Sequence, residues 1–150
     1  MKIQQELLDN IIDEMIPLTE QHYNEIDHYL QRNKCSLDPD YDKYFLIEES
    51  GGLQIVTARE DDNRLIGYVF YLVDTHAHYS GVTFGYCDIL FVDPGYRNSG
   101  VASEMLLYAE KNIGCDYMTL SEKPGHEFPR LISSLNYELL ETTYVKRVSK

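Results

Sequence analysis

The N-terminal part of the chain places apolar side chains at helical spacing. Over the first 16 residues they recur every three or four positions, at Leu7, Leu8, Ile11, Ile12, Met15 and Ile16. This spacing predicts a helix over residues 1–16 that ends at Pro17. A second helix is predicted to begin after Thr19 as its N-cap and to bury Tyr23, Ile26 and Leu30. A short third helix is predicted over residues 41–49, ending at two glycines.

From residue 53 the pattern changes to runs of β-branched and aromatic residues. The runs are LQIVTAR (53–59), LIGYVFYLV (65–73) and TFGYCDILFV (83–92), and polar turn residues separate them. Three strands in an antiparallel meander are therefore predicted. A helix over residues 100–112, a strand over 117–120, a helix over 127–135 and a final strand pair over 137–148 are predicted to follow.

These elements together predict the fold class. A strand, a helix and a further strand in succession form a parallel crossover, here between residues 90 and 120. The expected fold is α+β with three layers, in which a mixed central sheet combines the meander with this crossover and carries helices on both faces. A length of 150 residues fits one domain.

Charge narrows the range of partners. The net charge is −12, with 15 acidic and 5 basic residues in positions 1–62 but 10 and 8 in positions 63–150. Binding to nucleic acid or to an anionic membrane needs a basic surface, so neither is expected. The acidic front either attracts a cationic partner or is a solvated surface that aids solubility. No apolar run has the length of a bilayer span, and a cytoplasmic location is expected.

Metal and disulfide chemistry have little support in the sequence. The three cysteines are widely spaced, so reduced thiols are expected and no zinc site is indicated. His76 and His78 lie two residues apart without adjacent further ligands. They are interpreted as exposed hairpin residues or as part of a loop at a substrate entrance.

The stretch YRNSGVASEML (96–106) has the features of an anion site. It follows an apolar strand and a Pro-containing turn, and its glycine opens an amphipathic helix. Free backbone N–H groups at a helix N-terminus attract phosphate, Gly100 permits close approach of the backbone, and Arg97 can add a charged contact. We predict that this stretch binds a pyrophosphate. Neither Gly-Lys-Ser/Thr nor GxGxxG is present, so the P-loop and dinucleotide patterns do not apply.

At this stretch the sequence resembles the GCN5-related N-acetyltransferase (GNAT) superfamily. The superfamily loop is Arg or Gln, two residues, Gly, one residue, and Gly or Ala, and it is matched here by residues 97–102. Leu135-Asn136-Tyr137-Glu138 is similar to the Leu-Gly-Phe/Tyr signature after the last core helix of the superfamily. The order of elements from residue 53 onward also agrees with the superfamily.

The resemblance implies an acetyl-CoA-dependent N-acetyltransferase that acts on a primary amine of a small cationic molecule or a protein, as a monomer or a homodimer. It implies one acyltransferase domain over residues 1–150, with a helical front segment (1–52) on the acceptor side and a coenzyme A-binding core (53–150). It also implies which residues contact the cofactor. These are Leu90, Phe91 and Val92, where splaying of the strand receives the pantetheine, and Tyr96, Arg97, Asn98, Ser99, Gly100, Val101, Ala102 and Ser103 around the pyrophosphate.

The residues that transfer protons are assigned from fewer observations than the residues that contact the cofactor. An amine must lose its proton before it attacks, and Asp88 precedes an apolar run as the base of histone-type relatives does. Asp88 is therefore the predicted base; the alternatives are a structural carboxylate or one that only orients the substrate ammonium. Tyr137 and Tyr144 are the candidate acids, although a thiolate can also leave without protonation. Glu25 and the acids of residues 38–49 are expected to face the acceptor.

The sequence also departs from the superfamily pattern. The usual tyrosine is replaced by Ile132, Asn136 stands at the signature glycine, and the expected first strand reads as helix. Two other functions therefore stay open: a non-catalytic acyl-CoA-binding or interaction module with this fold, and an acidic binding protein.

Overall fold

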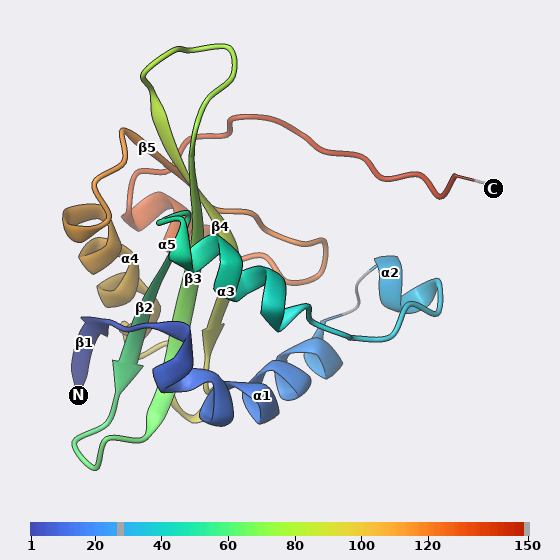
Figure 1. Ribbon diagram of the computed structural model, residues 1–150. Coiled ribbons are helices and arrows are strands. Elements are labelled where there is room, and N and C mark those ends of the chain that lie inside the picture. Colours follow the sequence, from blue (N-terminus) through green and yellow to red (C-terminus); the bar gives the residue numbers. More distant parts are fainter. Residues whose placement is uncertain (27–28, 149–150) are drawn as a thin grey trace.

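A computed structural model describes residues 1–26 and 29–148 (Figure 1). Its five strands are β1 (Lys2–Gln5), β2 (Leu53–Arg59), β3 (Leu65–Thr75), β4 (Thr83–Val92) and β5 (Tyr117–Thr119). Its helices are α1 (Leu8–Glu25), α2 (Tyr29–Arg32), α3 (Tyr41–Glu49), α4 (Val101–Asn112) and α5 (Pro129–Ser134), with a 3₁₀ turn η1 (Pro94–Tyr96) after β4. No helix in these described parts is both long and apolar enough to cross a membrane.

The strands form one mixed sheet in the order β1-β2-β3-β4-β5. The pairs β1–β2, β2–β3 and β3–β4 are antiparallel, and β5 runs parallel to β4 after the α4 crossover. The predicted fold class is therefore confirmed. The strands at 53–59 and 83–92 and the helix at 41–49 have the bounds that their apolar patterns predicted.

Two apolar cores lie on opposite faces of the sheet. On one face α1 and α3 cover β2 and β3 through Leu8, Ile11 and Phe70, with Phe91 of β4 beside them. On the other face α4 packs Met105 against Val69 and Tyr71 of β3. Alternation along the strands sends successive side chains to opposite faces, so β2, β3 and β4 each contribute to both cores.

The start of the chain differs from the prediction. Residues 1–16 were expected to form one helix, but Lys2–Gln5 is a strand that pairs antiparallel with Val56–Arg59. Four residues with one strongly apolar side chain, Ile3, give little local signal, and the pairing comes from distant β2. The sheet therefore begins with the first strand that the GNAT pattern leads one to expect.

Pro17 does not end a helix, and Thr19 is not an N-cap. Both lie inside α1, which continues to Glu25. Pro17 removes the hydrogen bond to the carbonyl of Asp13, but both residues are exposed, so water can satisfy that carbonyl. The Thr19 hydroxyl instead lies 3.0 Å from the Tyr68 hydroxyl. The helix persists because its apolar face is packed on the sheet.

The predicted strand pair at the C-terminus is also wrong. Residues 137–148 contain no strand, and residues 138–148 are exposed along their whole length. In Figure 1 this segment leaves the body of the protein as an extended tail. A β-rich sequence becomes a strand only where it has a neighbour to pair with.

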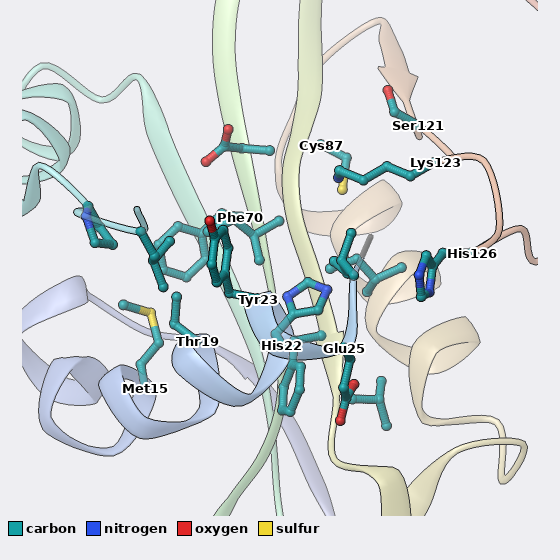
Figure 2. A pocket seen from close by; sticks show the side chains of 18 of the residues that line it. Met15, Thr19, His22, Tyr23, Glu25, Phe70, Cys87, Ser121, Lys123 and His126 are labelled. Carbon is teal, nitrogen blue, oxygen red and sulfur yellow. The ribbon is translucent and has the colours of Figure 1, made fainter. Parts of the chain in front are cut away.

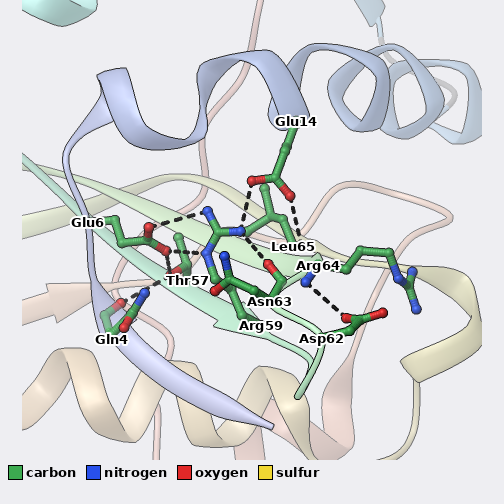
Figure 3. A network of polar contacts seen from close by, with 9 residues as sticks. All are labelled: Gln4, Glu6, Glu14, Thr57, Arg59, Asp62, Asn63, Arg64 and Leu65. Atoms are coloured by element: carbon green, nitrogen blue, oxygen red, sulfur yellow. Dashed lines mark hydrogen bonds and ion pairs between the residues drawn. The ribbon is translucent and has the colours of Figure 1, made fainter.

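A buried arginine ties the front of the chain to the sheet (Figure 3). Arg59 is 3% exposed, and its guanidinium bonds both carboxylate oxygens of Glu6 and Oε1 of Glu14. It also donates to the backbone oxygen of Asn63 at 2.7 Å. Burial alone would raise the pKa of Glu6, but hydrogen bonds from Arg59 and Thr57 hold it below its usual value. The link between β1 and α1 is therefore fixed to the β2–β3 hairpin by a charged, satisfied cluster.

Candidate active site

A cavity of about 1020 Å³ lies between the helical front segment, the second half of β4 and the chain that follows β5. Figure 2 shows side chains pointing into it from each of these parts: Thr19, His22 and Glu25 of α1, Phe70 of β3, Cys87 of β4, and Ser121, Lys123 and His126 after β5. Small-molecule sites typically measure about 300–1000 Å³. This cavity is therefore large enough for one long ligand and a second one beside it.

The second half of β4 opens this cavity because its pairing is irregular. Phe70 pairs with Ile89 and Tyr71 with Cys87, so Asp88 is an extra residue in a β-bulge. On the other side, β5 pairs only with Phe84, Gly85 and Tyr86. Beyond Tyr86 the β4 edge is left without a β5 partner, and residues 87–92 line the cavity.

The turn after β4 exposes the start of α4. Asp93 accepts a hydrogen bond from the Gly95 N–H, which begins η1. Gly100 is the N-cap of α4 with φ of +94°, a left-handed conformation that favours glycine, and no side chain caps the helix. A Cβ at Gly100 would meet no atom within 4 Å, so open space lies above it. The free N–H groups of the first turn, which begins at Val101, therefore have room to receive an anion.

Arg97 is held beside this helix start by two contacts. Its Nε donates to the carbonyl of Val92 at 2.9 Å, and its Nη2 bonds Oε2 of Glu25 at 2.5 Å. Burial raises the pKa of Glu25, but the hydrogen bonds from Arg97 and Gln21 outweigh it and the net pKa is below the usual value. Glu25 was expected on the acceptor side. The structure instead pairs it with Arg97, the residue predicted to bind the pyrophosphate.

Asp88 forms a second polar pair inside the cavity. The hydroxyl of Tyr44, on α3, donates to Oδ2 of Asp88 at 2.5 Å. Burial and the adjacent Asp88 raise the pKa of Tyr44 well above its ordinary value, so this phenol stays protonated and keeps donating. Asp88 is itself exposed. Its Oδ1 is therefore accessible to a ligand while Oδ2 is held by Tyr44.

Two further side chains on the cavity wall are uncharged at neutral pH. Burial, with a contribution from Lys123, lowers the pKa of His22 to about 4, and its ring lies 5.4 Å from that of Phe91. Burial, with a contribution from Asp88, raises the pKa of Cys87 to about 12. A thiol with that pKa is not a nucleophile at neutral pH, so Cys87 supplies no reactive thiolate to the cavity.

Comparison with known proteins agrees with this geometry. A profile of the Acetyltransferase (GNAT) family matches residues 11–127. The chain belongs to this GNAT family. The resemblance predicted from residues 97–102 is therefore confirmed, although none of the curated proteins compared with the chain matches it.

Solved GNAT structures share the fold at low sequence identity. An aminoglycoside acetyltransferase from an uncultured soil metagenomic sample, in complex with sisomicin, is 14% identical with a TM-score of 0.70 over 99% of this chain and 95% of that one. AAC(6')-Iy in complex with a CoA-linked bisubstrate analogue is 19% identical with a TM-score of 0.70 over 99% and 98%. Ribosomal-protein-alanine N-acetyltransferase from Brucella melitensis biovar Abortus 2308 is 19% identical with a TM-score of 0.66 over 99% and 100%.

The structure brings most of the predicted GNAT cofactor contacts to one place. Leu90, Phe91, Val92, Arg97 and Ala102 line the cavity. The other predicted residues form the adjoining turn and helix start, namely Tyr96, Asn98, Ser99, Gly100, Val101 and Ser103. The Val101 side chain is buried in the α4 core, so only its backbone can serve a ligand.

The predicted acids are not brought to the GNAT cavity. Tyr144 lies in the tail and is 90% exposed, whereas Tyr137 is half-buried, with Tyr71 and Cys87 among the groups that influence its pKa. Neither is among the described residues that line the cavity. His76 and His78 lie at the tip of the β3–β4 hairpin, outside that wall, and no group of three or more potential metal ligands occurs in the described residues.

Proposed function

We propose that this protein is an acetyl-CoA-dependent N-acetyltransferase that acetylates a primary amine of a small cationic molecule or a protein. One observation carries the proposal: the uncapped start of α4 and the paired carboxylate of Asp88 belong to the same stretch of sheet and loop beside one cavity. We further propose that residues 1–150 act as one acyltransferase domain, with residues 1–52 facing the acceptor and residues 53–150 binding the cofactor.

The residues present fit coenzyme A. The first-turn N–H groups of α4, the open space over Gly100 and the guanidinium of Arg97 suit a pyrophosphate. The edge of β4 at residues 87–91, which has no β5 partner, offers backbone groups to an amide-containing arm such as pantetheine. Bound acetyl-CoA would supply an activated thioester carbonyl.

Asp88 is the proposed proton acceptor. Its Oδ1 can take a hydrogen bond from an incoming ammonium and then accept the proton directly or through water, while Tyr44 holds Oδ2. Asp38 and Asp40 of the front segment line the same cavity and add negative charge on that side. This arrangement supports a cationic acceptor.

Acetyl-CoA binding is expected to be lost when the anion site is altered. Arg97→Glu and Gly100→Glu place a carboxylate against the pyrophosphate, and each is expected to weaken acetyl-CoA binding about 100-fold or more in calorimetric titration. Lys111→Glu makes the same charge change as Arg97→Glu at the other end of α4 and should leave affinity within about twofold.

The outcomes of this titration separate the candidate functions. If the wild-type protein binds no acetyl-CoA, the transferase proposal is wrong, and a role as an acidic binding protein is the function that remains. Binding without release of CoA across a panel of amines would instead favour the non-catalytic module. A polyamine, an aminoglycoside and a lysine peptide make a suitable panel because they present primary amines in three different contexts.

Glu25→Gln is expected to tighten acetyl-CoA binding about 3- to 10-fold. In the structure Glu25 holds Arg97 at 2.5 Å, so a pyrophosphate has to compete with this carboxylate and is repelled by it. Glu20→Gln removes the same charge from an exposed position on α1 and should have little effect. If Glu25→Gln weakened binding, the carboxylate would be orienting Arg97 for the cofactor rather than competing with it.

A further inference from the structure

Aromatic side chains form a continuous exposed surface at the end of the sheet where β3 is joined to β4. Tyr79, Tyr86 and Tyr117 are 60%, 39% and 59% exposed. In Figure 1 the β3–β4 hairpin extends beyond α3 and α4. Single exposed rings are ordinary, but a contiguous exposed apolar surface marks an interaction site. We call this surface the aromatic strip, and it consists of His76, Tyr79, Phe84, Tyr86 and Tyr117.

The rings of the aromatic strip contact one another in series. Phe84 stacks on Tyr86 with ring centroids 5.6 Å apart and on Tyr117 with centroids 5.2 Å apart. The ring of His76 lies 4.9 Å from that of Phe84 and 4.8 Å from that of Tyr79. Each ring therefore restricts the movement of its neighbours. The strip is a preorganised surface, so little side-chain entropy is lost when a ligand binds to it.

The aromatic strip faces the same side of the sheet as the cavity. Leu72 lines the cavity and packs on the core beneath α1 and α3, and its cross-strand partner is Tyr86. Phe84 lies two residues before Tyr86 and pairs with Tyr117, so these three rings share that face. A tyrosine of α3 bonds Asp88 from the same side. The strip therefore begins beside the proposed proton acceptor and leads away from it.

The length of this surface exceeds that of a small amine. Phe84 lies four residues before Asp88 on β4, about 13 Å away at 3.3 Å per residue. Ring contacts then carry the surface on to His76 and Tyr79. Asp88 and the strip together extend over roughly 20 Å, which is the length of about six residues of extended peptide. An acceptor that reaches from Asp88 along the whole strip therefore has the dimensions of a peptide segment.

The part of the chain that carries the strip is acidic. Residues 65–96 contain three acidic residues and residues 112–122 contain two, and neither range contains a lysine or an arginine. The faces of exposed tyrosine rings attract cations, most often the guanidinium group of arginine. Aromatic faces in an acidic surrounding therefore fit a cationic partner and disfavour an anionic one.

We propose that the aromatic strip binds a basic segment of a protein whose primary amine lies at Asp88 for acetylation. This inference rests on the proposed transfer to an amine at Asp88, and it identifies the acceptor as a protein. Cationic side chains next to the acceptor amine stack on Tyr86, Phe84 and Tyr117. A small amine occupies only the cavity and gains nothing from the more distant rings.

Binding of a labelled peptide tests the strip without any turnover. The probe is a fluorescent peptide of about eight residues with one lysine between arginines, and the reference peptide has alanine in place of each arginine. In fluorescence anisotropy the wild-type protein is expected to bind the arginine peptide at least about 10-fold more tightly than the reference. The double variant Tyr86→Ala and Tyr117→Ala should lose most of this preference, although its net charge is unchanged. Tyr86→Phe with Tyr117→Phe retains the aromatic faces and should retain the preference.

Leu107→Ala is the matched control for the loss of exposed apolar surface. Leu107 is 41% exposed on α4, which packs on the opposite face of the sheet. This variant should bind both peptides as the wild type does, and circular dichroism verifies that every variant is folded. Equal binding of the two peptides by the wild type, or an undiminished preference in the double alanine variant, would overturn the proposal.

Turnover distinguishes this proposal from the proposed function. Release of CoA is measured with the arginine peptide and with butylamine, which presents the lysine amine without flanking residues. The double alanine variant should lower kcat/KM about 10-fold for the peptide and leave kcat/KM for butylamine within about twofold. Tyrosine-dependent peptide binding without turnover of either acceptor would contradict the transferase but support the strip. Turnover of butylamine without any preference for the arginine peptide would support the transferase but contradict the strip.

Discussion

Asp88→Asn is expected to lower kcat/KM for the amine acceptor by about 100- to 10,000-fold, the range for a lost general base. The amide keeps the shape of the side chain and an oxygen that can still accept from the Tyr44 hydroxyl, so the cavity is preserved. It cannot take a proton from an ammonium. The affinity for acetyl-CoA, measured by calorimetry, is expected to stay within twofold because Asp88 lies on β4 and not in the α4 turn.

The kinetics should be followed by release of the CoA thiol from acetyl-CoA with the best amine of the panel. Asp74→Asn is the matched control, since Asp74 also lies on a strand of this sheet but outside the described cavity wall. Recovery of the Asp88→Asn rate at high pH, where more of the acceptor is already neutral, would support a proton-accepting role. Unchanged kcat/KM at neutral pH would show that another group takes the proton.

Arg59→Met is expected to destabilise the fold by about 3–5 kcal/mol, the range for removing one partner from a buried ion pair. Methionine fills part of the space but leaves the carboxylate of Glu6, whose side chain is 11% exposed, without its cation. Glu14 loses a partner as well, although its second oxygen still accepts from the Leu65 N–H. For a chain of this size the melting temperature should fall by about 10 °C or more.

Thermal and urea unfolding followed by circular dichroism measure this effect. Arg64→Met is the control: its side chain is 51% exposed, and it should change stability by less than about 1 kcal/mol. A similar small change for Arg59→Met would mean that the Glu6 carboxylate is solvated in the folded protein.

The middle of the fold could be predicted from the sequence because its signals are local. The strands β2 and β4 consist of continuous β-branched and aromatic runs between turns, and α3 lies between Asp40, which caps it, and two glycines. The ends of the chain could not be predicted in this way. β1 depends on pairing with β2, and the helical spacing that continues from Leu7 onward masks it. A proline usually ends a helix, but tertiary packing carries α1 past Pro17.

The same distinction between local signals and distant contacts applies to the candidate site. The turn from Tyr96 to Ser103 is a local motif, so its residue types and spacing were sufficient to find it. Tyr44 and Glu25 gain their roles from contacts with residues 44 and 72 positions away, and no short sequence pattern reports such contacts. His22 was missed for the same reason, since its depressed pKa comes from burial in a cavity that several elements build together.

Because of the bulge in β4, residue 88 is an extra residue that does not take part in the regular pairing of β4 with β3. Cys87 pairs with Tyr71 and Ile89 pairs with Phe70, and Asp88 lies between them without a cross-strand partner. Changes at this position therefore need not disturb either apolar core. A substitution at residue 88 can therefore change the side chain that faces the cavity while the architecture around it stays the same.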